Sequence, residues 1–354
     1  MAIPTEPIGS IPRPPELIDG MGAAAEGRIS ADDLEALYVS ALRDTIAELE
    51  ATGSPVITDG EQRKPSFATY PIQGLDALAP DGVVIPFADG HTRQLPTLTR
   101  GPFRYRTHAD SYLTEAQRYA TRPLKQAVIS ASALSLLYPQ DGIEDYPREA
   151  FLADLVDEAE TDIRRCLDAG AHSVQIDFTE ARLSLKLDPS GGLLRSFVDL
   201  NNSVIGRFTT GERQRIGVHT CPGGDHDSTH SADVDYAQLL PLLFDLDAGA
   251  FYLQLASEPD PGAVLEAVEA SLKPGQQVFV GVTDPISPAV ETSEEVRDRV
   301  LEAADHIPLA QLGTTDDCGF SPFADDTSTA RATAFAKIRA RVVGTELAAE
   351  RLAL

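Results

Sequence analysis

The sequence of 354 residues is 42% hydrophobic and 24% charged, an ordinary globular composition that excludes disorder over the whole chain. Its 55 acidic and 29 basic residues give a net charge of −26, which repels phosphate backbones and anionic lipids and argues against a nucleic-acid or membrane partner. No apolar run reaches the ~18 residues of a membrane helix, no secretory signal is visible, and three cysteines are too few for a disulfide framework, so we expect a cytoplasmic protein.

Short β-rich runs alternate with amphipathic helices along the chain, a pattern typical of a parallel sheet. The expected strands are residues 55–58, 126–130, 173–177, 216–219, 251–255, 278–283 and 309–313. The expected helices are residues 31–52, 148–169, 292–305 and 327–352. Seven expected strands, with an eighth that the pattern does not reveal, predict a (β/α)8 TIM barrel in a single domain over residues 1–354. An open doubly wound sheet is the alternative, but no Gly-x-Gly-x-x-Gly turn follows an early strand.

Two segments interrupt this alternation. Residues 76–108 contain glycine, proline and short β runs at 83–87 and 103–106, which predict a hairpin inserted after the first barrel strand. Residues 220–235 are polar and contain glycines, and they follow the fourth expected strand. The second segment is either a lid that closes over a substrate or a plain surface loop.

Most of the expected strands end in, or are followed by, polar side chains. In a TIM barrel these C-terminal ends and the loops after them form the active site, so the groups should converge although they span some 260 residues. The residues concerned are Thr58, Asp59, Glu61, Gln175, Asp177, His219, Cys221, Gln254, Asp284 and Cys318.

His219, Cys221 and Cys318 form the sharpest local signal. A spacing of two at a strand end places His219 and Cys221 on the same side of the backbone. Imidazole nitrogen and thiolate both suit zinc, and three protein ligands with an open position are typical of a catalytic zinc site. Buried packing is the alternative for these residues. Cys166 lies in an expected helix and is interpreted as a small buried hydrophobic residue.

Five short motifs appear in the order seen in the catalytic C-terminal half of cobalamin-independent methionine synthase, which this chain resembles over nearly its whole length. They are Ile8-Gly-Ser10, Gly60-Glu61, Gln175-Ile-Asp177, His219-x-Cys221 and Asp317-Cys-Gly319. The resemblance implies a (β/α)8 barrel and a Zn2+ ion that binds the acceptor thiol as a thiolate for attack on an alkyl carbon. Zinc supports that chemistry because it lowers the pKa of a thiol.

The resemblance also implies roles for individual residues. His219, Cys221 and Cys318 match zinc ligands. Glu61 and Asp177 match carboxylates that hold the amino group of homocysteine, and Ser10 matches a segment that meets its carboxylate. Asp284 matches an acidic strand-end position, and Glu61 and Asp284 are the expected catalytic carboxylates.

The sequence departs from the family pattern at three points. The family's fourth zinc ligand, a glutamate, is replaced by Gln254, so that Gln254 or the nearby Glu258 is the candidate fourth ligand. The family's proton-donating histidine is replaced by Ile286. The folate-binding N-terminal half is missing from this sequence, which makes a folate triglutamate a poor direct donor.

These departures leave three interpretations open. The first is methyl transfer to homocysteine by a stand-alone core enzyme that uses another methyl donor. The second is ring opening of an epoxide by coenzyme M, as in the related epoxyalkane:coenzyme M transferases, with Arg63 and Lys64 as candidate contacts for the sulfonate. The third is a barrel without metal that is decarboxylase-like or does no catalysis. In the first two interpretations, the partners are a small thiol (homocysteine or coenzyme M) and an alkyl donor (a methyl donor or an epoxide). An oligomer is compatible with the sequence.

Overall fold

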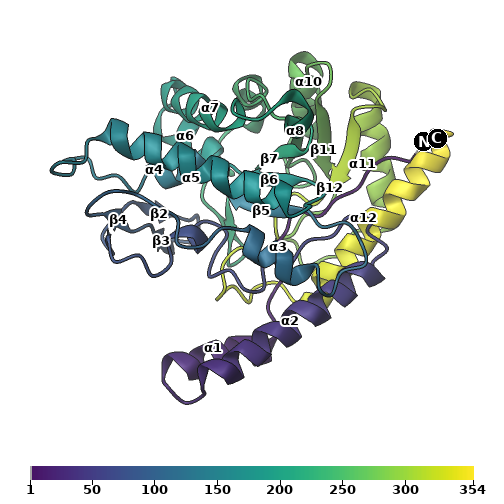
Figure 1. The fold of residues 1–354 in the computed structure, drawn as a ribbon. Helices are drawn as coiled ribbons and strands as arrows, with labels where there is room; N and C mark the ends of the chain where they lie inside the picture. The colour runs from purple at the N-terminus through teal and green to yellow at the C-terminus, as the bar shows by residue number, and fades with distance from the viewer. Residues whose placement is uncertain (1) are drawn as a thin grey trace.

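The computed structural model describes residues 2–354, and six parallel strands form its central sheet (Figure 1). The strands are β5 (Gln126–Ile129), β6 (Val174–Asp177), β7 (Ile216–Thr220), β10 (Ala250–Leu253), β11 (Gln277–Gly281) and β12 (Leu312–Thr315). They are hydrogen-bonded in the order β12-β11-β10-β7-β6-β5. These strands are almost entirely buried, as expected of parallel strands covered on both faces.

Two further segments extend the sheet to eight positions and bring its edges together. Thr5 forms a parallel bridge with Thr314 of β12, and Ile57 forms one with Leu124 at the start of β5. The amide of Ile11 donates to the carbonyl of Gly60 over 3.0 Å, and Thr58 Oγ1 donates to the carbonyl of Gly9 over 2.8 Å. The ring is thus joined by these single contacts, without a continuous strand ladder among the described residues at this junction.

Helices follow most strands and lie around the outside of the sheet, whereas the first helix and the start of the second extend together away from it (Figure 1). They are α1 (Pro15–Ala25), α2 (Ala31–Ala51), α3 (Asp110–Ala116), α4 (Ala131–Ser135), α5 (Arg148–Asp168), α6 (Glu180–Leu187), α7 (Gly192–Ile205), α8 (Thr210–Arg213), α9 (Leu240–Leu243), α10 (Pro261–Ser271), α11 (Ser293–His306) and α12 (Arg331–Arg351). Single 3-10 turns occur at Tyr70–Ile72 and Tyr236–Gln238. Capping boxes fix the starts of α2 and α11, where Ser30 and Thr292 exchange hydrogen bonds with Asp33 and Glu295. Cys166 of α5 is fully buried in the core, as predicted.

The inserted segment 76–108 contains two small antiparallel pairs. Strand β2 (Val84–Pro86) pairs with β3 (Thr92–Gln94), and β1 (Leu78–Ala79) pairs with β4 (Thr97–Leu98). A third pair, β8 (Gly224–Asp225) with β9 (Ser228–Thr229), lies in the polar segment after β7. No described helix is long and apolar enough to span a membrane.

Three local expectations were wrong. Residues 103–106 form no strand, because the backbone there is held by side chains, with Tyr146 Oη accepting from Phe103 N and Glu158 from Tyr105 N. Residues 55–58 contribute one bridge and not a full strand. The last strand begins at Leu312, since the preceding residues form a turn in which Gln311 N donates to the carbonyl of Pro308.

A buried charge pair lies inside the ring near the start of β5. Lys125 Nζ is 3.6 Å from a carboxylate oxygen of Glu6 and 3.9 Å from the centroid of the Tyr252 ring. Tyr252 Oη donates to the same carboxylate over 2.6 Å. Burial lowers the pKa of Lys125 to about 8, in spite of its attraction to Glu6. The pKa of Glu6 is lowered to about 2, because contacts with His172, Lys125 and Tyr252 outweigh its burial.

Candidate metal centre

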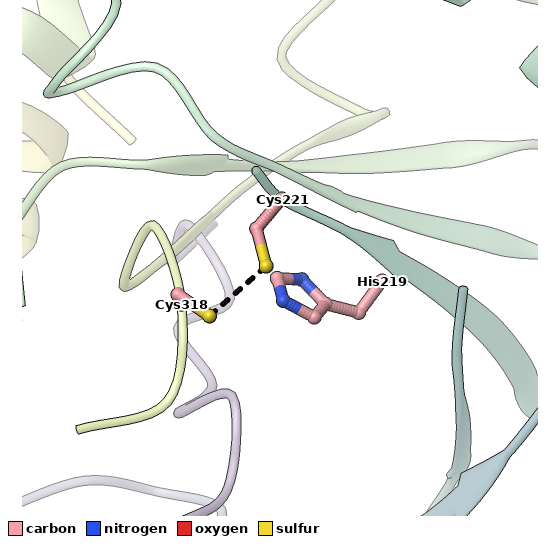
Figure 2. Close-up of side chains that lie close together, drawn as sticks. All are labelled: His219, Cys221 and Cys318. Carbon is pink, nitrogen blue, oxygen red and sulfur yellow. Dashed lines mark hydrogen bonds between the residues drawn. The ribbon is translucent and has the colours of Figure 1, made fainter. Parts of the chain in front are cut away.

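Three predicted zinc ligands converge at the C-terminal ends of two strands. His219 lies in β7, Cys221 directly follows β7, and Cys318 lies in the loop after β12. One ligand atom from each lies within 4.8 Å of the others, and the two sulfur atoms are 3.0 Å apart. Figure 2 shows the imidazole and both thiols pointing toward one another. The two cysteines are 97 positions apart in the sequence, and the fold brings them together from strand ends that are not neighbours in the sheet.

The hydrogen bonds of His219 leave one nitrogen free for a metal. Nδ1 lies 3.2 Å from the carbonyl oxygen of Tyr252, which only accepts, so Nδ1 carries the proton. Nε2 is buried and has no hydrogen-bond partner. A metal-binding histidine commonly shows this arrangement, in which a backbone carbonyl fixes the tautomer and the ring orientation. One imidazole nitrogen and two thiols fit zinc.

The two candidates for a fourth ligand have different surroundings. Glu258 is buried against Arg182, with a carboxylate oxygen 2.5 Å from the guanidinium. The Nε2 amide of Gln254 donates to Ser257 Oγ over 2.8 Å, and its Oε1 is buried without a partner. Among the described residues, Gln254 therefore offers an unpartnered oxygen, whereas the carboxylate of Glu258 is already paired with Arg182.

Asp317, next to Cys318, fastens the loop after β12 to the loop after β10. Its Oδ1 accepts from the amides of Leu255 and Ala256, each over 2.9 Å, and its Oδ2 accepts from the amide and hydroxyl of Ser257, each over 2.7 Å. Burial raises the pKa of Asp317 to about 6 in spite of these hydrogen bonds. The motif Asp317-Cys-Gly319 was noticed in the sequence, but nothing there indicated this positioning contact.

The first of two pockets beside the cluster is lined by most of the expected substrate residues. We call it the Glu61 pocket. It is lined by Ile8, Gly9, Ser10, Glu61, Phe67, Gln175, Asp177, Thr179, His219, Cys221, Gly223, Gly224, Cys318, Gly319 and Pro322. The N-terminal segment packs on the Cys318 loop here, and Ser10 Oγ accepts from the amide of Ser321 over 3.2 Å. A Cβ on Gly319 would lie 2.2 Å from Ser10 Oγ, so only glycine allows this approach.

A tight turn directs Glu61 into this pocket. Gly60 and Glu61 have φ angles of 62° and 54°, both in the left-handed region. A side chain at Gly60 would lie 2.5 Å from Thr45, which adds a steric reason for glycine. The turn is held by Asp59 Oδ1, which accepts from the amide of Glu61 over 3.0 Å. A non-glycine residue in this conformation is typical of a site whose geometry serves function.

Burial dominates the electrostatics of the two pocket carboxylates. It raises the pKa of Glu61, because desolvation and the charges of Asp177 and Asp59 outweigh the attraction of Lys64. It likewise raises the pKa of Asp177, in spite of the hydrogen bond over 2.7 Å that Gln175 Nε2 donates to it. Lys64 is paired with Glu61, so the two buried acids keep a net negative charge that is suited to receiving an ammonium group.

The two predicted cationic contacts do not line this pocket. Lys64 Nζ is buried and donates to Glu61 Oε1 and to the carbonyl of Ala127, each over 2.9 Å. Burial by itself lowers the pKa of Lys64, but the neighbouring carboxylates raise it above its usual value. Arg63 lies farther out, at 2.7 Å from Glu35 and 3.0 Å from Glu115. Both cations are therefore neutralised by acidic partners.

A second pocket also has Cys318 in its wall and is here called the Asp284 pocket. Gly224, Cys318, Gly319 and Pro322 line both pockets. The remaining walls include Gln254, Asp284, Ile286, Asp317 and Phe320. Asp284 Oδ1 accepts from the amide of Ile286 over 2.9 Å, which holds the loop after β11 in a turn.

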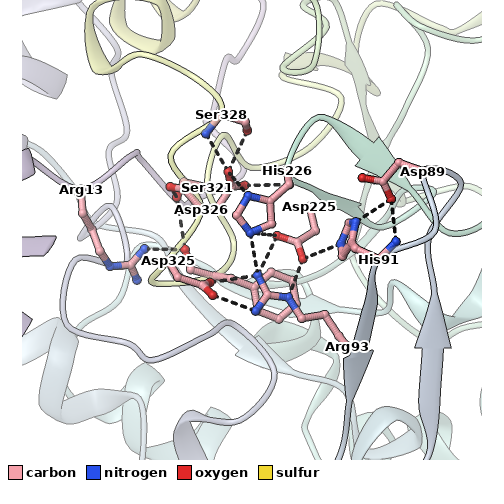
Figure 3. Close-up of polar contacts among 11 residues, drawn as sticks. Arg13, Asp89, His91, Arg93, Asp225, His226, Ser321, Asp325, Asp326 and Ser328 are labelled. Carbon is pink, nitrogen blue, oxygen red and sulfur yellow. Dashed lines mark hydrogen bonds and ion pairs between the residues drawn. The ribbon is translucent and has the colours of Figure 1, made fainter. Parts of the chain in front are cut away.

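Three segments far apart in the sequence meet in a network of polar contacts (Figure 3). Arg93 of β3 lies 2.5 Å from Asp225 of β8 and 2.9 Å from Asp325 in the loop before α12. His91 Nε2 is 3.0 Å from the same carboxylate of Asp225. The network fastens the inserted hairpin to the polar segment after β7, whose Gly224 lines both pockets. Its His91 and Arg93 were not singled out from the sequence, since only the fold brings them to Asp225.

Comparison with known proteins agrees with this arrangement. The family model described as the catalytic domain of cobalamin-independent synthase matches residues 3–339. Methionine synthase of Sulfurisphaera tokodaii is 23% identical over 350 residues, which cover 99% of this chain and 94% of that protein. The 5-methyltetrahydropteroyltriglutamate–homocysteine methyltransferase of Nitratidesulfovibrio vulgaris is 24% identical over 323 residues, and the match covers 90% of this chain but 38% of that protein.

A solved structure establishes the shared fold. The B12-independent methionine synthase from Shewanella sp. W3-18-1, in complex with selenomethionine, superimposes with a TM-score of 0.76 at 19% identity, with full coverage of both chains. The prediction of a (β/α)8 barrel is confirmed by this likeness and by the ring of strands described above.

Proposed function

Because this chain belongs to the family of cobalamin-independent methionine synthase catalytic domains, we propose that it transfers a methyl group to the thiol of homocysteine at a zinc ion held by His219, Cys221 and Cys318. The observation that carries the proposal is the buried, unpartnered Nε2 of His219, which lies with two thiols beside a pocket walled by two carboxylates. Zinc bound there would lower the pKa of the substrate thiol and supply a thiolate at neutral pH.

The residues of the Glu61 pocket orient the acceptor. Glu61 and Asp177 receive its ammonium group, because the single lysine paired with Glu61 leaves a net negative charge on the two buried acids. Ser10 Oγ already accepts from Ser321 N, so its own hydroxyl hydrogen is free to donate to the substrate carboxylate. Held at both charged groups, the acceptor directs its sulfur toward the open side of the cluster, where Cys318 separates the two pockets.

Coenzyme M is the less favoured acceptor. Its sulfonate needs a cation, and the residues predicted for that contact are paired, Arg63 with two glutamates and Lys64 with Glu61. No Lys or Arg of the described chain lines the Glu61 pocket. A barrel without metal would leave the free imidazole nitrogen and the two adjacent thiols unexplained.

The test is to measure zinc per chain by elemental analysis, and then proton release as homocysteine, coenzyme M and 2-mercaptoethanol are added. We expect stoichiometric zinc and proton release with homocysteine at far lower concentration than with the other two thiols. Asp177→Asn should weaken the response to homocysteine more than that to 2-mercaptoethanol, which has no amino group. Absence of zinc, or preference for coenzyme M, would contradict the proposal.

A further inference from the structure

We propose, on the basis of the function proposed above, that the Asp284 pocket binds the methyl donor and that this donor is a small cation of the methylsulfonium class. The placement follows from Cys318, which lies between the two pockets and lines both. A thiol oriented in the Glu61 pocket has its sulfur at this boundary. A methyl group presented from the Asp284 pocket then lies within reach of that sulfur, with its leaving group directed away from the thiol as in-line displacement at the methyl carbon requires.

The charges of the Asp284 pocket indicate the donor class. Five aspartates and no Lys, Arg or His line it in the described part of the chain. Three of them are satisfied: Asp225 by Arg93 and His91, Asp317 by four hydrogen bonds, and Asp326 by the amide and hydroxyl of Ser328. Among the described residues, the half-buried Asp284 carboxylate accepts only from Ile286 N, and the exposed Asp227 at the pocket mouth has no hydrogen bond or ion pair. These two carboxylates therefore line the pocket without a counter-charge from the described residues.

A second feature of the same pocket, which the acceptor thiol would free by taking the fourth position on zinc, points to a ligand there. The side chain of Gln254 is only 3% exposed, and its Oε1 has no hydrogen-bond partner. A buried carbonyl oxygen of this kind costs free energy unless a bound group satisfies it. With the thiol as the fourth zinc ligand, the partly negative oxygen of Gln254 adds to the attraction for a cation. Phe320, also in the wall, offers apolar contact to methyl groups.

The pocket also lacks a side chain suited to protonating a leaving group. Its loop after β11 carries Ile286, and the buried Asp317 uses both oxygens as acceptors. A sulfonium donor needs no proton. The electron pair of the thiolate sulfur forms the new bond to the methyl carbon, the bond from that carbon to the sulfonium sulfur breaks, and its electron pair stays on the departing neutral thioether. The thiol proton has already been released to solvent on binding.

The experiment compares two methyl donors of different charge on the zinc-loaded protein with homocysteine. Trimethylsulfonium carries the positive charge, whereas methyl iodide is neutral and also needs no proton. We measure kcat/KM for each donor and take their ratio. Asp284→Asn and Asp227→Asn should each lower the sulfonium-to-iodide ratio about tenfold. Asp168→Asn makes the same charge change at the exposed end of α5, before β6, and should leave the ratio unchanged.

Binding without turnover gives a second readout. Equilibrium dialysis of labelled trimethylsulfonium, without homocysteine, should show retention that falls in both pocket variants and at high ionic strength. A ratio that stays the same in the Asp284 and Asp227 variants overturns the inference. Alkylation by methyl iodide without any by trimethylsulfonium also overturns it, while leaving the thiol activation intact. No alkylation by either donor, with no proton release by homocysteine, overturns the proposed function and this inference together.

Discussion

Asp317 accepts two 2.7 Å hydrogen bonds from Ser257, one from the amide and one from the hydroxyl, and thereby holds the Cys318 loop against the end of β10. Because Asp317 is hydrogen-bonded to the backbone that follows β10, it fixes the position of the next residue, Cys318. The relationship explains why Gly281 is required, since a Cβ there would lie 1.9 Å from Asp317 Oδ1.

Replacing Asp317 by asparagine should loosen the metal centre. An amide group in place of one oxygen cannot accept from Ser257, so at least one buried donor loses its partner. We expect zinc affinity to fall by about 10- to 100-fold, as is typical when an outer contact of a metal ligand is lost. Competition with a chromophoric chelator measures this. Unchanged affinity would show that the clamp does not position Cys318.

The three cysteines offer a matched comparison of metal binding. Cys221→Ser and Cys318→Ser should lose most of their zinc and their activity, because a serine hydroxyl is a poor ligand for zinc at neutral pH. Cys166→Ala removes a buried thiol from α5, away from the cluster, and should keep its zinc. Elemental analysis of the three purified variants measures the zinc that each retains. Full zinc in either serine variant would contradict the ligand set.

Glu258→Gln separates the two candidates for a fourth ligand. The change leaves the buried guanidinium of Arg182 without its anionic partner, so we expect a stability loss of about 3 kcal/mol in urea unfolding. Zinc content measured under native conditions should be unaffected. Loss of zinc from protein that remains folded by circular dichroism would place Glu258 at the metal instead.

Gln254→Glu should strengthen zinc binding by about tenfold or more, because a carboxylate is a better ligand than a neutral amide. Gln254→Ala removes the same oxygen without adding a charge and serves as the control. A chelator competition with both variants provides the measurement. Weaker binding in the glutamate variant would show that this side chain does not reach the metal.

The convergence of the site was predictable from the sequence, whereas its contacts were not. His219, Cys221 and Cys318 were recognised because parallel strands present their C-terminal ends at one edge. The bridge at Thr5 escaped because a single paired residue leaves no periodic signal, whereas residues 55–58 were expected as a strand and contribute only the bridge at Ile57. The ion pairs of Arg63 and Arg182 join residues 28 or more positions apart, and nothing in local sequence specifies such partners.

Stability should depend on pH through the buried Lys125. Its pKa is lowered to about 8 from the usual 10.5, so between these values the unfolded chain binds more protons than the folded one. The free energy of unfolding contributed by this group therefore rises with pH in that window. In Lys125→Met this rise should disappear. Urea unfolding of both proteins at pH 8 and pH 10 measures the difference, and equal pH dependence in the two would contradict the assignment.

The contact between Ser10 and Ser321 joins residues 311 positions apart, and it forms one wall of the Glu61 pocket. During synthesis on the ribosome, Ser10 therefore cannot contact Ser321 until almost all of the chain has been made. Closing so long a loop is costly in entropy and comes late in folding. Cys318 belongs to the same late part of the chain, so binding of zinc at the proposed site would require a barrel that is already complete. Zinc uptake timed against synthesis would serve as a natural marker for the last folding step.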